Sequence, residues 1–316
     1  MTPRILWRVL ALVPILFIIS VLTFLIGKAS PGDPIKAGLN QTLSADAIDD
    51  IRSSYGLDLP LREQYWQWVK GLFSEGGGRS ITQGSKVFEM LSDAFVNTLI
   101  LTFAAIVISV VFGVAIGTIA ALNHNRFVDR AIMLLVQIGS NLSIYWFGLI
   151  LIWVFAIQLK ALPSTGMYDM RSGSESFTYL LFHLILPGFS AALMSMLILA
   201  RFARAGVIDS LESDYLRTFR SQGVGNRVLI GKHVMRNVAP TILNTTGLEI
   251  GTLLSGAIFV EFVFNWPGLG AQLVNAIGGH DYPVIQGGVL LVTVIFVLVN
   301  LSTDIIQDLL NPRLRS

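Results

Sequence analysis

Apolar residues along this chain gather into six long runs, which polar or turn-forming segments separate. A helix needs about 20 consecutive apolar residues to cross the hydrocarbon core of a bilayer. The six runs are about that long and cover residues 7–27, 95–122, 131–159, 180–200, 238–264 and 284–306. The pattern predicts an all-α integral membrane protein with six transmembrane helices.

The first run also has features of a secretory signal peptide. Arg4 and Arg8 stand at its start, and Ala29 and Ser30 follow it. However, its apolar stretch is longer than the roughly 7–15 residues of a signal peptide, and no small-x-small cleavage site follows cleanly. We interpret the run as a retained transmembrane helix.

The placement of basic residues predicts the orientation of the spans. Lys and Arg are enriched in the short cytoplasmic connections of membrane proteins. Here they gather at both chain ends and in residues 123–130 and 201–237, whereas the two short connections on the opposite side hold only Lys160 and Arg171. Both termini are therefore expected to be cytoplasmic, which agrees with an even number of spans.

Residues 28–94 form a long polar segment after the first predicted span. They contain several acidic residues, three consecutive glycines at 76–78 and an amphipathic stretch at 65–73, whose aromatic residues suit a membrane interface. We therefore divide the chain into residues 1–94, a first transmembrane helix with an extracytoplasmic segment, and residues 95–316, a five-helix core.

Composition supports a membrane protein and argues against several kinds of chemistry. The chain is 53% hydrophobic and 13% charged, whereas soluble domains are about 25% charged. It has no cysteine, its 4 histidines lie far apart, and its net charge is only +2. We therefore expect no metal site and no nucleic-acid partner. No catalytic group is expected either, because no Ser–His–acid or paired-carboxylate arrangement has supporting context.

The charged segment 201–237 is the most informative of the predicted cytoplasmic stretches. Its apolar residues recur at helical spacing, charged residues fill the other face, and Gly223 and Gly225 follow. The apolar positions are Val207, Ile208, Leu211, Tyr215 and Phe219. This pattern predicts a short amphipathic helix. It could lie on lipid headgroups, dock in a groove of a partner or be a solvated connector.

The chain is not expected to bind ATP itself. Residues 225–233 come nearest to a phosphate-binding loop, but their glycine spacing is one residue too long. In addition, His233 stands where a Ser or Thr should bind Mg²⁺.

Several segments resemble ABC import permeases and, among these, the dipeptide/oligopeptide/nickel permease family. The strongest match is Glu-Phe-Val-Phe-Asn-Trp-Pro-Gly-Leu-Gly at 261–270. The other matching segments are residues 31–34, 55–60, 212–223, 236–237, 280–287 and 311–313. They follow the family's order from near residue 30 to the C-terminus. The chain departs from the family pattern at Phe219, where relatives commonly keep an alanine.

This resemblance implies the fold of an ABC type I importer permease and import by alternating access. Two such permeases, usually paralogues, would pair in the lipid bilayer. Two cytoplasmic ATPases would bind ATP and Mg²⁺ and grip the coupling helices, and an extracytoplasmic solute-binding protein would deliver the solute. The chain itself would need no cofactor and would not be an enzyme. It would lie in the cytoplasmic (inner) membrane of a bacterium or archaeon.

The family's solutes are dipeptides, oligopeptides, glutathione, nickel and metal chelates. We favour peptides, including glutathione, with nickel or metal-chelate uptake by the same mechanism as the alternative. The resemblance also implies an ATPase-coupling loop at Glu212, Asp214, Tyr215, Arg217, Thr218, Phe219 and Gly223. A structural turn would follow at Trp266, Pro267, Gly268 and Gly270.

Acidic residues inside the fifth run are candidates for the translocation pathway or its gate. Glu249 lies near the middle of this run, where a charge is costly. It marks either a pathway or a structural carboxyl that is hydrogen-bonded near Asn244 or Thr245. Glu261, near the outer end, is either part of an outer gate or a helix-end contact with the following turn.

Other residues of the predicted spans have simpler alternatives. Asn141 and Ser143 in the third run either line the pathway or pack helices together. Gly113 and Gly117 stand four apart on one face of the second run, and such a pair lets two helices of the chain approach closely. Arg204, at the inner end of the fourth run, is most simply a charge that sets topology.

Two other kinds of protein compete with an importer. A secondary transporter driven by an ion gradient would be expected to have acid or histidine relays inside the membrane and internal repeats. Here only Glu249 lies near the middle of a predicted span, and no repeat is evident. A membrane assembly or insertion factor would leave the predicted coupling helix without a role.

Overall fold

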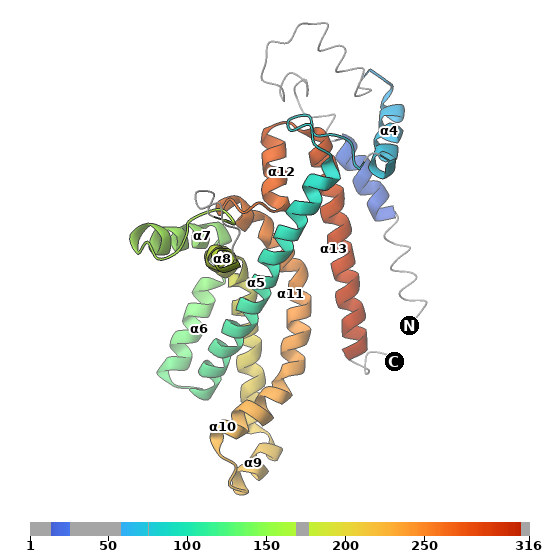
Figure 1. The fold of residues 1–316 in the computed structure, drawn as a ribbon. Helices are drawn as coiled ribbons and strands as arrows, with labels where there is room; N and C mark the ends of the chain where they lie inside the picture. The colour runs from blue at the N-terminus through green and yellow to red at the C-terminus, as the bar shows by residue number, and fades with distance from the viewer. Residues whose placement is uncertain (1–13, 26–57, 75, 169–176, 311–316) are drawn as a thin grey trace. The chain divides into compact units, whose positions relative to one another are not determined.

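The computed structural model describes residues 14–25, 58–74, 76–168 and 177–310 (Figure 1). This part of the chain is helical, and its β-pairing is limited to an isolated bridge between Arg79 and Lys86. The helices are Pro14–Leu25, α4 (Leu61–Ser74), α5 (Val87–Leu122), α6 (Phe127–Gly139), α7 (Ile144–Leu151), the π-helix η1 (Ile152–Gln158), α8 (Phe177–Glu212), α9 (Asp214–Ser221), α10 (Asn226–Val228), the π-helix η2 (Leu229–Val234), α11 (Met235–Val263), α12 (Leu269–Gly278) and α13 (Tyr282–Leu310).

Four of the described helical stretches are long and apolar enough to cross a membrane. They are Val87–Leu122, Phe177–Glu212, Asn226–Val263 and Tyr282–Thr303, and they match the second, fourth, fifth and sixth predicted runs. The first run is described as the short apolar helix Pro14–Leu25, and the rest of that run lies outside the described residues. A bent helix pair could supply one more span. The protein is therefore all-helical, with four to five apolar spans in its described part.

The third predicted run is not one straight helix, which corrects the sequence interpretation. Phe127–Gly139 and Ile144–Gln158 form a helix pair that is bent by 109° at the break between them. The side chains of Ser140 and Asn141 donate hydrogen bonds to carbonyl oxygens four residues back, at 2.8 and 2.7 Å. These bonds satisfy backbone oxygens at the end of α6, so the chain can leave the helix there without leaving them unpaired.

The chain divides into two compact units. One unit comprises Met1–Thr98 and Pro267–Ser302, and the other comprises Leu99–Trp266 and Thr303–Ser316. Each unit contains residues that lie close together in space. The division after residue 94 was made by sequence pattern, and it stays a prediction.

In the first unit, aromatic residues join helix Pro14–Leu25 to α4. The hydroxyl oxygens of Ser20 and Tyr65 lie 2.8 Å apart, and the rings of Phe24 and Tyr65 meet edge to face with centroids 5.5 Å apart. Trp68 also lies beside Phe24, whereas Trp66 is 52% exposed. The amphipathic stretch predicted at 65–73 is thus part of a helix that packs on the first apolar helix.

Asp281 fixes the loop that precedes α5 in the same unit. Its carboxylate is buried and accepts hydrogen bonds from the hydroxyls of Ser80 and Thr82, at 2.5 and 2.7 Å. The backbone N–H groups of Ile81 and Thr82 donate to it at 3.2 and 3.1 Å. Because Asp281 stands directly before α13, four hydrogen bonds to a carboxylate tie the loop to the start of that helix.

In the second unit, α5 and α8 pack backbone against backbone. A Cβ atom on Gly117 would lie 2.3 Å from the carbonyl oxygen of Ala200, and one on Gly113 would lie 2.7 Å from that of Met196. Real Cβ atoms do not come so close to backbone, so this contact requires glycine at both positions. It confirms the tight packing within the chain that the spacing of the two glycines predicts.

Candidate functional site

Residues 201–237 form a small helical lobe, called here the 201–237 lobe. It comprises the last turns of α8, then α9, α10 and η2, and the first residues of α11 (Figure 1). α8 continues to Glu212, and the backbone becomes extended at Ser213 (φ −69°, ψ 146°) before α9 begins. The single amphipathic helix expected from the sequence is therefore two helices, which corrects that prediction.

Leu216 anchors α9 in the lobe. It is completely buried, in a cluster that also contains Val207, Leu229, Val234 and Val238. Tyr215, which the apolar spacing placed on the buried face, is instead 39% exposed. The reason is the break at Ser213, because spacing counted across a break no longer describes one face of one helix. The sequence pattern therefore missed Leu216.

Gly223 ends α9 in a conformation that favours glycine. Its φ is +80°, and the N–H of Val224 donates to the carbonyl of Phe219 at 3.2 Å. The N–H of Gly223 donates to the carbonyl of Arg220 at 3.0 Å. These two bonds form a Schellman motif, in which a residue with positive φ closes the helix. The predicted end of the helix at Gly223 is confirmed.

Two further contacts hold the lobe together, one between α9 and η2 and one between α8 and α11. The ring of Phe219 stacks on that of His233, with centroids 4.3 Å apart and planes 30° apart. The side-chain amide of Asn237 donates to the hydroxyl of Ser210 at 2.9 Å. The lobe is therefore held by its own apolar core and by polar contacts, and it is not a loose connector.

The other candidate coupling residues lie on the exposed side of the lobe. Glu212, Asp214, Arg217 and Thr218 are all exposed. Arg217 lies 3.6 Å from Asp214, but both side chains are more than two-thirds exposed, at 73% and 96%. Because an exposed pair of this kind contributes little to stability, this face of α9 can contact another protein without unfolding the lobe.

Glu249 forms its hydrogen bond with a different helix from the one expected. The hydroxyl of Ser195 on α8 donates to Oε2 of Glu249 on α11 at 2.7 Å. Ser195 is buried, whereas Glu249 is partly exposed. Thr245, one of the two expected neighbours, donates its hydroxyl to the carbonyl of Thr241. The serine thus orients the carboxylate across the packed helix pair α8 and α11.

Glu261 is completely buried in the last turn of its helix. Its backbone carbonyl accepts a hydrogen bond from the N–H of Trp266 at 2.8 Å, and Trp266 is also completely buried. Phe264 lies between them in the sequence and is almost fully buried. The end of α11 is therefore folded into the core of the second unit.

The remaining candidates lie at helix ends. Gly268 is the N-cap of α12, Gly270 is buried in the first turn of that helix, and Pro267 is exposed. Asn141 and Ser143 are exposed at the break between α6 and α7. Among the described residues, no group of three or more His, Cys, Asp and Glu residues could hold a metal ion.

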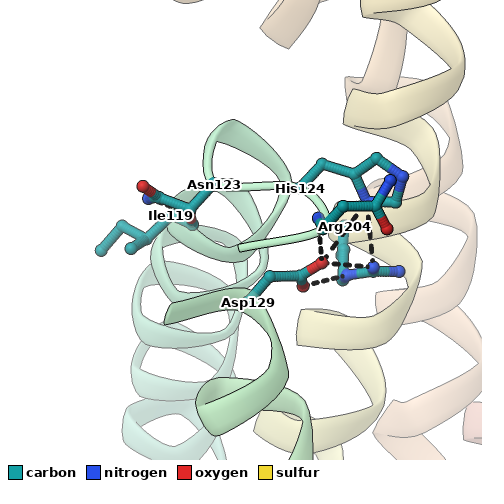
Figure 2. Close-up of polar contacts among 6 residues, drawn as sticks. Ile119, Asn123, His124, Asp129 and Arg204 are labelled. Atoms are coloured by element: carbon teal, nitrogen blue, oxygen red, sulfur yellow. Dashed lines mark hydrogen bonds and ion pairs between the residues drawn. The ribbon is translucent and has the colours of Figure 1, made fainter. Parts of the chain in front are cut away.

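One polar cluster was missed by sequence reasoning. Arg204 on α8, which the sequence explains most simply as a charge that sets topology, pairs with Asp129 on α6 at 2.7 Å, beside His124 (Figure 2). No local signal connects these residues, because Asp129 and Arg204 lie 75 positions apart in the sequence.

Two family models match the chain. The model described as "binding-protein-dependent transport system inner membrane component" covers residues 113–316, and the corresponding N-terminal model covers residues 1–102. Both halves of the chain thus match models of one transport system, in the order that the sequence resemblance implies.

Relatives and a solved structure agree with these models. The glutathione transport system permease protein GsiC of Escherichia coli K12 is 37% identical over 98% of this chain and 97% of the relative. The protein of that name from Shigella boydii serotype 4 is 38% identical with the same coverage. A chain of the MetNI methionine ABC transporter, in an inward-facing conformation, shares the fold with a TM-score of 0.54. That likeness covers 71% of this chain and 97% of the other at 16% identity. The chain therefore belongs to the binding-protein-dependent transport system inner membrane component family of ABC permeases, as a non-enzymatic membrane protein.

Proposed function

We propose that this chain is the transmembrane permease subunit of an ATP-driven importer for peptides, with glutathione among its solutes. The observation that carries this proposal is the 201–237 lobe, which has a buried apolar core and an exposed polar face on α9. A compact lobe can transmit displacement from one rigid body to another, whereas a loose linker cannot. The relatives that align over 98% of the chain support the class of solute.

The proposal includes six spans with both termini in the cytoplasm of a bacterium or archaeon. The bias of Lys and Arg toward the chain ends, residues 123–130 and residues 201–237 supports this orientation. In this arrangement, the 201–237 lobe faces the cytoplasm, where ATP is available.

The partners follow from this arrangement. Two cytoplasmic ATPases, which bind ATP and Mg²⁺, would dock on the exposed face of α9 and on its counterpart in a paralogous second permease. An extracytoplasmic binding protein would deliver the solute. This chain itself would hold no cofactor.

The test of the proposal is to purify the permease together with the ATPase and the binding protein encoded beside it. Native mass spectrometry of the binding protein would identify its ligand. A peptide or glutathione is the expected result, and a nickel ion or metal chelate would keep the mechanism but change the solute. If no ATPase co-purifies, the proposal of an ATP-driven importer is overturned in favour of an ion-driven transporter.

Glu249 is proposed to meet cationic groups of the solute in the pathway. Ser195 holds this partly exposed carboxylate in place. A hydrogen bond to a charged group contributes about 1.5–3 kcal/mol. We therefore expect Glu249→Gln to slow uptake of a lysine-containing dipeptide about tenfold relative to a neutral dipeptide.

The measurement is uptake of both dipeptides into proteoliposomes that contain the complete transporter. Thr245→Val is a suitable control, because it removes a hydroxyl from the same helix. That hydroxyl bonds to a backbone carbonyl of its own helix, at Thr241. An unchanged ratio between the two dipeptides in Glu249→Gln would exclude a pathway role for this carboxylate.

A further inference from the structure

An ion pair of forked geometry connects α6 to the last turns of α8, where the 201–237 lobe begins. Nε of Arg204 donates to Oδ1 of Asp129 at 2.7 Å, and its Nη2 donates to Oδ2 at 2.8 Å (Figure 2). The Asp129 side chain is 4% exposed and that of Arg204 is 25% exposed. Two parallel bonds fix both the distance and the orientation of the guanidinium relative to the carboxylate.

The same carboxylate also closes the turn between α5 and α6. The N–H of Asn125, whose φ is +64°, donates to Oδ2 of Asp129 at 3.1 Å. Nδ1 of His124 lies 3.4 Å from that oxygen and 3.2 Å from Nη2 of Arg204 (Figure 2). Asp129 therefore holds its own turn and α8 at one point.

This point lies where the apolar part of α8 continues into the lobe. A Cβ atom on Gly117 of α5 would lie 2.3 Å from the carbonyl oxygen of Ala200 and 2.9 Å from the backbone nitrogen of Arg204, so α5 and α8 pack closely beside the ion pair. α8 then continues without interruption to Glu212, where the lobe turns into α9. Any displacement of α9 that moves α8 must pass the position of Arg204.

A charge that only sets topology does not require this geometry. Cytoplasmic segments are enriched in Lys and Arg, and a lone arginine at a helix end contributes to that enrichment without an acidic partner. A buried pair is also weak evidence for stability, since the cost of desolvation offsets much of the attraction. What the forked contact to a buried carboxylate supplies is a fixed orientation between two helices.

We propose that Asp129 and Arg204 are a positioning pair that makes the α5–α6 turn follow α8 when an ATPase displaces α9. Without the pair, α8 would move and α6 would not follow it. Fewer solute molecules would then be imported for each ATP hydrolysed. This inference rests on the proposed function, because it requires an ATPase partner.

The test compares Asp129→Asn with the wild type in proteoliposomes that contain the whole transporter. The readout is the number of solute molecules imported per ATP hydrolysed, which a merely structural role would not change in correctly assembled complexes. We expect this ratio to fall about fivefold or more, as for the loss of a typical coupling between sites. The exchanged pair Asp129→Arg with Arg204→Asp should recover a large part of it.

Arg201→Gln is the matched control. It removes a cation from the same end of α8, and Arg201 is exposed. Its import-to-hydrolysis ratio should equal that of the wild type. An unchanged ratio in Asp129→Asn, or an equal fall in Arg201→Gln, would overturn the proposal. If the wild-type complex itself shows no ATP-dependent uptake, the proposed function fails instead.

A second measurement decides the matter if Asp129→Asn assembles poorly. Arg204→Lys keeps the charge but loses the fork. Because the chain has no native cysteine, spin labels can be placed at the exposed positions Val128 and Ser221. We expect the distance between the labels to stay the same with and without ATP in the wild type, and to change with ATP in Arg204→Lys. Identical behaviour in the two proteins would contradict the pair's positioning role.

Discussion

Replacing Gly223 by tryptophan is expected to abolish solute-stimulated ATP hydrolysis while leaving the permease folded in the membrane. A Cβ atom at Gly223 would meet nothing within 4 Å, so a large side chain would project outward from the end of α9. There it would obstruct a docked ATPase. We expect stimulated hydrolysis to fall about tenfold or more, because each ~1.4 kcal/mol of lost docking energy is a factor of ten in affinity.

The φ of +80° at Gly223 requires two controls, because any larger residue also strains the backbone. Asparagine tolerates positive φ, so Gly223→Asn should retain most of the activity. Gly223→Ala adds about 1–2 kcal/mol of strain without bulk and should lie between the other two variants. Stimulated hydrolysis is measured with the purified complex. If the tryptophan variant retained wild-type stimulation, the ATPase would have to dock elsewhere.

The second large effect is expected at the contact between α5 and α8. In Gly117→Ala, the added Cβ would lie 2.3 Å from the carbonyl oxygen of Ala200 and 2.8 Å from Cβ of Ala203. Backbone atoms cannot rotate away as a flexible side chain can, so the two helices would have to separate. Overpacking of this kind costs about 1–3 kcal/mol or more.

The yield of membrane-integrated complex and its Tm in detergent would measure this effect. Both should be clearly lower in Gly117→Ala than in the wild type. Gly71→Ala is the matched control, because a Cβ there meets nothing within 4 Å in α4. Since alanine is the better helix former, that control should be neutral or slightly stabilising. An unchanged Tm in Gly117→Ala would mean that the close contact is absent from the protein in the membrane.

Much of the fold could be predicted from sequence, because apolar runs report directly on membrane burial. The runs at 95–122, 180–200 and 284–306 each lie within a described helix, and the run at 238–264 coincides with part of α11 except for its last residue. The position of the 201–237 lobe and the end of α9 at Gly223 were also predictable, since a glycine after a periodic stretch is a local signal. The 109° break after α6 was not predicted, because the apolar run continues across it.

The polar contacts of the site could not be predicted, because they join residues that are distant in sequence. Ser195 and Glu249 are 54 positions apart, and Asp129 and Arg204 are 75 apart. Periodicity reports which face of one element is apolar, but it does not report which neighbour that element meets. Leu216 was missed for a different reason, since the break at Ser213 interrupts the spacing that would have revealed it.

The length of α8 has a consequence for the membrane in which the protein works. Its 36 residues, at 1.5 Å per residue, extend about 54 Å, whereas the hydrocarbon core is about 30 Å thick. The 25 residues that follow Pro187 would by themselves exceed that thickness, at about 37 Å. If α8 spans the bilayer, its fixed length determines how far α9 lies from the membrane surface. Lipids with longer acyl chains would then draw the docking face toward the headgroups, and the transporter would respond to membrane thickness as well as to its solute.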